Sequence, residues 1–135
     1  LTAPMTLPRP AAVDPAPLAR FNVPILRAWP GAGPELVDFT IDSGVDGIVV
    51  EALGSGNVSE EMGRALVRAA EADIPVVMST SVPSGEVSLA YGGGGGGATL
   101  AQHGVLSAGW LRAGQARMAL LTALATGTDP RALLD

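Results

Sequence analysis

The sequence predicts a three-layer α/β domain in which a four-stranded parallel sheet carries helices on both faces. Short apolar runs alternate with segments of helical periodicity four times along the chain. The second and third apolar runs contain almost no polar residue, as expected of strands that are buried on both faces. The 135 residues, 47% of them hydrophobic, are enough for one domain with a sizeable core.

The first half of the domain is expected to hold two strands and two helices. The first strand is predicted at residues 23–28, before the turn Trp29-Pro30-Gly31. A helix then opens at Pro34, which suits a first helical position, and ends at Gly44, a residue that readily adopts a left-handed conformation. The second strand is predicted at residues 46–50.

Beyond the loop at residues 54–57, Ser59 is expected to cap a helix with apolar residues at the 3.6-residue period. The remaining elements are expected, in order, as a strand at 74–78, a helical turn at 99–103, a strand at 105–108, a helix at 112–126 and a final turn at 129–134. An irregular loop is predicted at residues 79–97. Its six consecutive glycines, residues 92–97, are interpreted as a mobile surface loop. The arrangement is similar to small Rossmann-like or flavodoxin-like domains.

Residues 1–20 differ in composition from the rest of the chain. They contain five prolines and little periodicity, which is typical of a semi-extended linker. We therefore expect an interdomain linker at 1–20, an α/β domain at 21–135, and a further domain before Leu1.

The composition excludes several kinds of chemistry. There is no Cys, so a thiolate nucleophile, a disulfide and a zinc-cysteine site are impossible, and all eight basic residues are Arg, which excludes a Schiff-base or Walker lysine. A single His makes a transition-metal site improbable. The net charge of −5 argues against a nucleic-acid partner, and no apolar run reaches the 18 residues of a membrane span. We therefore expect no metal site in this chain.

In an open parallel sheet, ligands bind beyond the carboxyl ends of the strands. The loops expected there carry Ser55, Asn57, Glu86 and Tyr91. Asn57 follows two glycines and precedes a helix, so its side chain either faces a ligand or bonds nearby backbone. The same glycines match a dinucleotide fingerprint poorly, because an acidic residue is missing at the end of the next strand.

Other polar side chains are interpreted as structural. His103 ends a helical turn, where a cation complements the helix dipole. Arg112 and Arg117 are expected to decorate the last helix or to form ion pairs on it.

Several segments follow one another in an order that resembles the C-terminal domain of bacterial-type L-asparaginases. They are residues 44–50, Gly54-Ser55-Gly56-Asn57, residues 74–79 with Val82-Pro83-Ser84-Gly85, Tyr91 with its glycines, residues 104–109 and Ala116-Arg117. The resemblance spans residues 23–127. Departures from the family pattern are Ser81 in place of a frequent Arg, Trp110 in place of a frequent Asp, and the lack of a carboxylate in residues 89–94.

The resemblance implies hydrolysis of L-asparagine to L-aspartate and ammonia without a cofactor, by a threonine nucleophile in an N-terminal catalytic domain. No catalytic residue is then expected in this chain. Asn57 matches the family asparagine that reaches the active site of a neighbouring subunit and helps to hold the substrate α-amino group. Ser55, Glu86 and Tyr91 are further candidate substrate contacts. The implied partners are the catalytic domain and other copies in a homodimer or homotetramer, in a cytoplasmic parent protein.

Two other functions are compatible with the sequence. An asparaginase-like domain can also serve as a regulatory or assembly module that binds a small amino acid or a partner without catalysis. A nucleotide-binding module is supported only by the glycines.

Overall fold

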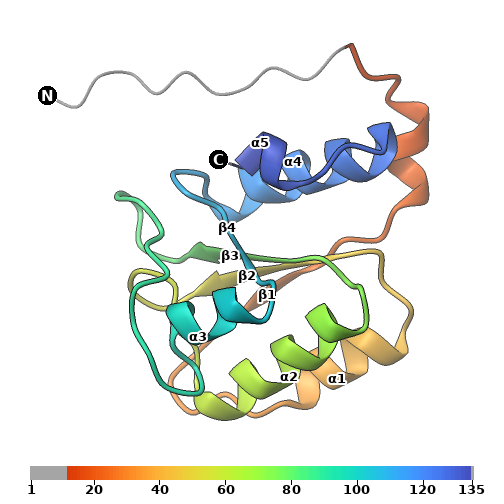
Figure 1. Ribbon diagram of the computed structural model, residues 1–135. Helices are drawn as coiled ribbons and strands as arrows, with labels where there is room; N and C mark the ends of the chain where they lie inside the picture. Colours follow the sequence, from red (N-terminus) through yellow and green to blue (C-terminus); the bar gives the residue numbers. More distant parts are fainter. Residues whose placement is uncertain (1–11, 135) are drawn as a thin grey trace, which may run out of the picture.

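The computed structural model describes residues 12–134, which form an α/β domain around one sheet. The four strands are β1 (Ile25–Arg27), β2 (Ile48–Ala52), β3 (Val76–Thr80) and β4 (Leu106–Ser107). They lie in the order β1-β2-β3-β4, and every neighbouring pair is parallel (Figure 1). The predicted four-stranded parallel sheet is confirmed.

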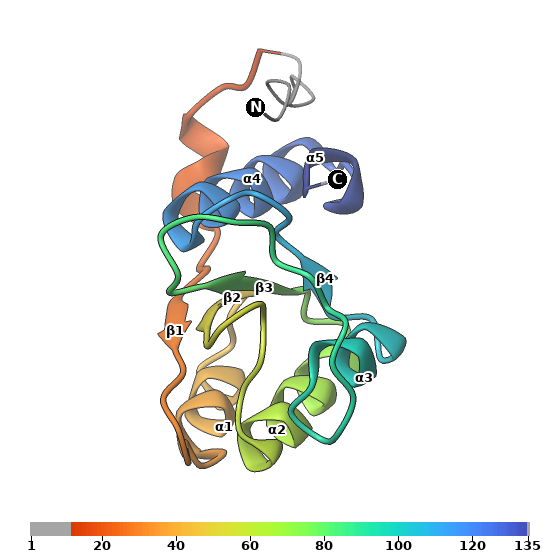
Figure 2. The same cartoon turned by 90° about the vertical axis from the view of Figure 1, so that its left-hand side faces the viewer.

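Helices cover both faces of the sheet. One face carries α1 (Glu35–Asp42), α2 (Glu60–Glu71) and α3 (Gly97–Gln102), and the other carries α4 (Ala113–Thr126), α5 (Arg131–Leu134) and a 3-10 helix, η1 (Ala16–Arg20) (Figures 1 and 2). The strands follow one another across the sheet in their order along the chain. With right-handed crossovers, this order places every helix that connects two strands on the same face. The chain turns back over the opposite face with α4, which follows the last strand, and α5 follows α4 on that face. Unlike a doubly wound sheet, this sheet has no reversal in strand order.

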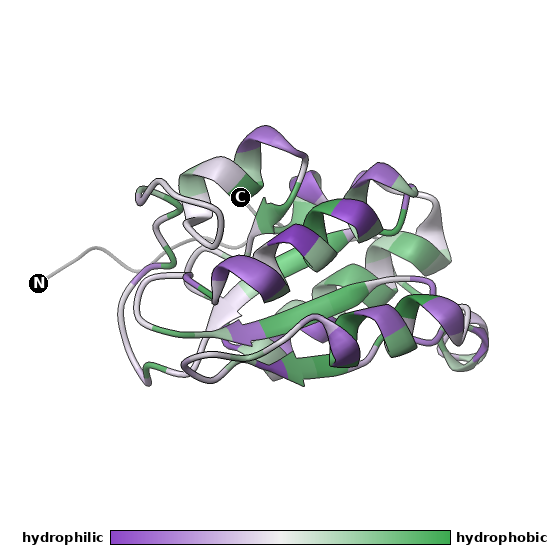
Figure 3. Cartoon of the chain, turned by 90° about the horizontal axis from the view of Figure 1, so that it is seen from below, coloured by the Kyte–Doolittle hydropathy of each residue, from purple (hydrophilic) through white to green (hydrophobic). Residues whose placement is uncertain are grey.

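Two hydrophobic clusters lie on either side of the sheet. Side chains alternate along β2, so that Val50 belongs to the cluster beneath α1 and α2, and Val49 belongs to the cluster beneath α4. All five residues of β3 are buried. Seen from below, the hydrophobic strands lie behind helices that bear alternating hydrophilic and hydrophobic stripes (Figure 3).

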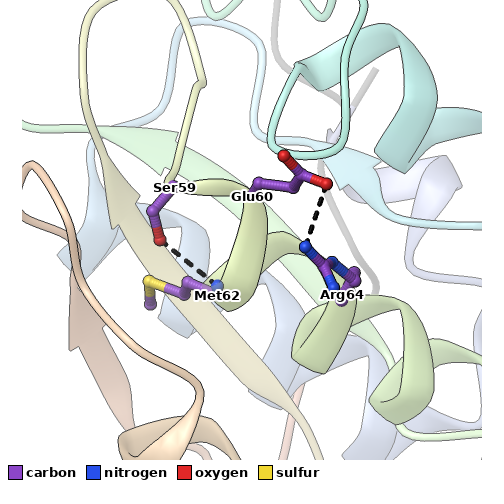
Figure 4. Close-up of polar contacts among 4 residues, drawn as sticks. All are labelled: Ser59, Glu60, Met62 and Arg64. Carbon is purple, nitrogen blue, oxygen red and sulfur yellow. Dashed lines mark hydrogen bonds and ion pairs between the residues drawn. The ribbon is translucent and has the colours of Figure 1, made fainter.

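The predicted start of α2 is confirmed. The Ser59 hydroxyl accepts a hydrogen bond from the backbone N–H of Met62 at 3.2 Å, and it donates a hydrogen bond to the carbonyl of Ala32. Glu60 and Arg64 form an ion pair at 2.9 Å on the next turn (Figure 4). The α2 cap therefore also ties this helix to the loop after β1.

The strand bounds differ from the prediction, and β2 and β3 each extend two residues past their predicted ends at residues 50 and 78. β2 reaches Ala52 and β3 reaches Thr80, because the parallel register continues from Glu51 opposite Ser79 to Ala52 opposite Thr80. Ser79 and Thr80 are therefore buried strand residues and not part of the following loop. Glu51, Ser79 and Thr80 are polar, so the apolar pattern that predicts a buried strand stops before them.

The N-terminal segment is only partly extended. Residues 1–11 lie outside the described part of the chain, but residues 16–20 form η1, so the prediction of a semi-extended segment is wrong there. Leu18 packs against the cluster beneath α4, and partial burial of this side chain favours the compact turn. Among the described residues, no helix has the length and apolar character needed to cross a membrane.

Candidate functional site

The loops after the strands meet at the carboxyl edge of the sheet, which faces the viewer in Figure 2. The loop after β2 is a tight turn closed by backbone hydrogen bonds between Leu53 and Asn57, with N···O distances of 2.8 and 2.9 Å. Gly54 and Gly56 have φ angles of +50° and +117°, which favour glycine. A Cβ atom on Gly56 would also lie 3.0 Å from the side chains of Val87 and Leu89. The turn that carries Asn57 is therefore closed on itself and packed against the segment after β3.

The Asn57 side chain is half-buried and bonds to distant backbone. Its Oδ1 accepts a hydrogen bond from the N–H of Gly97 at 3.4 Å. Because a backbone N–H can only donate, Oδ1 must face Gly97 and Nδ2 must point elsewhere. Within residues 12–134, no hydrogen bond donated by Nδ2 is found. Asn57 thus offers a donor at Nδ2 and one remaining lone pair at Oδ1.

The unused donor at Nδ2 and the unused lone pair at Oδ1 of Asn57 suit different parts of an amino acid. A carboxylate oxygen would accept from Nδ2, whereas an ammonium group would need the remaining lone pair of Oδ1. The side chain does bond backbone, but at Gly97, forty residues away, and not in the nearby chain as the structural alternative for Asn57 expected; this bond leaves the amide nitrogen available to a ligand. The role of Asn57 in substrate binding stays a prediction.

The glycine run supports the Asn57 turn. The carbonyl of Gly95 accepts a hydrogen bond from Val58 at 3.0 Å, and Gly97 bonds Asn57. A Cβ atom on Gly95 would overlap the carbonyl oxygen of Val58. Gly95, Gly96 and Gly97 are buried, so the interpretation of the run as a mobile surface loop is wrong for these residues. Their lack of side chains allows two backbone segments to touch.

The other predicted contacts lie around this turn without bonding to Asn57. Ser55 is half-buried within the turn, Glu86 is exposed, and Tyr91 is 62% exposed. Glu86 lies next to Val87, whose N–H donates to the carbonyl of Gly109 at 2.8 Å. The backbone on which Glu86 stands is therefore anchored, although its carboxylate reaches into solvent. Ser55, Glu86 and Tyr91 stay predictions as substrate contacts.

Two residues at this edge make contacts that sequence reasoning did not indicate. The Thr80 hydroxyl donates to the carbonyl of Gly54 at 2.5 Å and accepts from the N–H of Val82 at 3.0 Å. Arg112 was expected to decorate α4 or to form an ion pair, which is wrong, because its guanidinium bonds the carbonyls of Val82 and Gly85, both at 2.5 Å. Backbone carbonyls carry no residue-type signal, so no pattern in the sequence could have pointed to these contacts.

Two further side chains are structural. Nε of Arg117 donates to the carbonyl of Val23 at 2.7 Å, far from the carboxyl edge. His103 lies 3.4 Å from a carboxylate oxygen of Glu71 and joins the ends of α3 and α2. In the described part of the chain, no group of three or more His, Asp or Glu side chains is placed to hold a metal ion.

A profile of the family described as the glutaminase/asparaginase C-terminal domain matches residues 22–134. This chain belongs to that family. A probable L-asparaginase from Deinococcus radiodurans is 39% identical to this glutaminase/asparaginase C-terminal domain over 122 residues, which cover 90% of the chain and 36% of the relative. The chain therefore spans about a third of the length of that relative.

Archaeal relatives match a shorter part of the domain. A glutamyl-tRNA(Gln) amidotransferase subunit from Methanosphaera stadtmanae is 35% identical over 68 residues, half of this chain and 16% of the relative. The corresponding protein from Thermococcus kodakarensis is 39% identical over 68 residues, with the same shares of both chains. The resemblance to the asparaginase family that the sequence indicated is thus confirmed.

Proposed function

We propose that this domain is part of an L-asparaginase that hydrolyses L-asparagine to L-aspartate and ammonia, and that it completes the substrate site of a neighbouring subunit. The observation that carries this proposal is the state of Asn57, which stands on a closed turn at the carboxyl edge with a free amide nitrogen. Such a side chain can orient a substrate with little loss of conformational freedom.

The comparisons favour an asparaginase as the parent protein. The match to the probable L-asparaginase covers 90% of the chain, whereas the match to the Methanosphaera amidotransferase protein covers 50%. The chain itself contributes no nucleophile in this proposal. The threonine nucleophile belongs to an N-terminal catalytic domain, linked through residues 1–20, and the assembly is a homodimer or a homotetramer.

A second candidate is an amide-hydrolysing component of a tRNA amidotransferase, which the 68-residue matches to the archaeal amidotransferase proteins support. A third is a regulatory module that binds a small amino acid by itself. Calorimetric titration of the isolated chain with L-asparagine separates this last candidate, because a site shared between subunits should bind poorly when only half of it is present.

The experiment on Asn57 uses the chain together with its catalytic domain and measures kcat and KM for L-asparagine. We expect Asn57→Ala to lower kcat/KM by about 10- to 100-fold, because loss of an orienting contact misplaces the substrate. Asn22→Ala is the matched control, since Asn22 is the other asparagine of the chain and lies exposed before β1, at the opposite edge. Equal kinetic constants for the two variants, with an intact oligomer, would remove Asn57 from the site.

The variant Asn57→Asp shows whether the side chain binds the substrate through its Nδ2 donor or through the remaining lone pair of Oδ1. It keeps an acceptor and replaces the Nδ2 donor with a carboxylate oxygen. If Asn57 holds the substrate ammonium group, Asn57→Asp retains much more activity than Asn57→Ala. If it holds the substrate carboxylate, Asn57→Asp is at least as impaired as Asn57→Ala, because two carboxylates then repel each other.

A further inference from the structure

One hydrogen-bond network joins three loops at the carboxyl edge. The carbonyl of Gly54, in the turn of Asn57, accepts from the Thr80 hydroxyl, which in turn accepts from the N–H of Val82. The carbonyl of Val82 accepts from Arg112 at the start of α4. The loops after β2, β3 and β4 are therefore connected through two side chains.

Arg112 is the centre of this network. Its guanidinium donates to the carbonyls of Val82 and Gly85 at 2.5 Å each and to that of Trp110 at 3.2 Å. Its own backbone N–H donates to Oε1 of Gln115 at 2.9 Å, which fixes the residue at the first turn of α4. The rigid fork of a guanidinium can reach carbonyls that lie three residues apart, and hydrogen bonds from a charged donor are stronger than neutral ones.

The loop that Arg112 holds has little other support. Residues 82–86 are exposed, and nothing in this stretch belongs to either hydrophobic cluster. Its attachments on the two sides are the bond from Val82 to Thr80 and the bond from Val87 to Gly109. Without the guanidinium, the exposed residues between these points would be free to move.

We propose that Arg112 is a positioning residue that holds the loop at residues 82–85 and, through Thr80, the turn that presents Asn57. The inference rests on the proposed function of Asn57 for its catalytic consequence, and on the hydrogen bonds alone for its structural part. Arg112 touches no substrate in this account and acts only through the backbone of the loops.

The structural part is tested by hydrogen–deuterium exchange on the 135-residue chain. We expect Arg112→Gln to accelerate exchange in residues 82–86 by about tenfold, because the loop loses two charge-assisted hydrogen bonds, those to the carbonyls of Val82 and Gly85. Arg117→Gln is the matched control, since Arg117 lies on the same helix and bonds the distant carbonyl of Val23. If Arg112→Gln does not fold, Arg112→Lys replaces it, because a single ammonium group keeps the charge but cannot span the three carbonyls. Unchanged exchange in residues 82–86 would overturn the proposal.

The catalytic part is tested by kinetics of the same variants in the presence of the catalytic domain. We expect Arg112→Gln to raise KM for L-asparagine about tenfold with a smaller effect on kcat, and Arg112→Lys to recover only part of the loss. If exchange rises but KM stays unchanged in an active enzyme, Arg112 holds the loop without positioning the site, and the inference is wrong. If the unsubstituted protein has no asparaginase activity, the proposed function fails, while the exchange result still decides the role of Arg112.

Discussion

Two glycines of the same run have opposite environments. A Cβ atom on Gly95 would overlap the carbonyl oxygen of Val58, which lies immediately after Asn57, whereas a Cβ atom on Gly92 would meet nothing within 4 Å. Gly95 is buried and Gly92 is exposed. At the level of single residues, the run therefore contains both a packing requirement and a free position.

Gly95→Ala and Gly92→Ala should differ strongly in stability. We expect Gly95→Ala to lower the free energy of unfolding by about 1–3 kcal/mol or more, because the added methyl group forces two backbone segments apart. Gly92→Ala should be neutral or stabilise by up to about 1 kcal/mol, since it restricts the unfolded chain. Urea unfolding of both variants checks this difference. Equal midpoints would mean that the run packs less closely than the backbone contacts imply.

The helix α2 combines several local signals that agree with one another. Its buried side is formed by small and apolar residues at helical spacing, namely Met62, Gly63, Ala65, Leu66 and Ala69. Acidic residues occupy the first turn and Arg68 the last, which complements the helix dipole. Arg68 also bonds Asp38 of α1 at 2.5 Å, so the two helices are linked on their exposed sides. The helix is specified both by its own sequence and by its neighbour.

Ser59→Ala should lower the free energy of unfolding by about 1–2 kcal/mol, because it removes an N-cap and leaves the carbonyl of Ala32 without its donor. Thermal unfolding monitored by circular dichroism measures this effect. Ser88→Ala serves as the control, since Ser88 is exposed in the loop after β3. A shift of the same size in both variants would show that the cap contributes no more than an ordinary surface serine.

At the scale of the whole molecule, two exposed tryptophan side chains lie beside the carboxyl edge of the sheet. The chain has two tryptophans, Trp29 after β1 and Trp110 after β4, which are 51% and 43% exposed. They follow the two edge strands of the sheet and so flank the carboxyl edge. Exposed Trp side chains that flank a candidate site are typical of a surface that a partner covers.

Tryptophan fluorescence should therefore report on assembly. If the catalytic domain covers the carboxyl edge, as proposed, mixing the two should shift the emission maximum to shorter wavelength, because both indole rings lose water. Trp29→Phe and Trp110→Phe, measured separately, assign the shift to one side of the edge. Complex formation in gel filtration without any spectral change would place the partner on another face of the domain.

Much of the architecture follows from local patterns. Continuous apolar runs predicted the buried strands, Ser59 predicted the start of α2, and Gly44 indicated a helix end that has a φ angle of +74°. These features depend on side-chain periodicity and on the conformational freedom of single residues, which a sequence displays directly. The family resemblance rested on the same kind of ordered segments.

The contacts that hold the carboxyl edge together emerge from the three-dimensional arrangement alone. Asn57 bonds Gly97 forty residues further along the chain, Arg112 bonds carbonyls about thirty residues before it, and Gly95 touches the backbone at Val58. Each of these contacts involves the main chain, which is the same at every position apart from proline, so residue types carry no trace of the partner. The order of residue types was thus enough to define the layers of the domain and to single out its candidate site residue. The tertiary structure decided which atoms of Asn57 remain available to a ligand and which contacts hold its turn in place. Those contacts join backbone segments that lie far apart in the sequence.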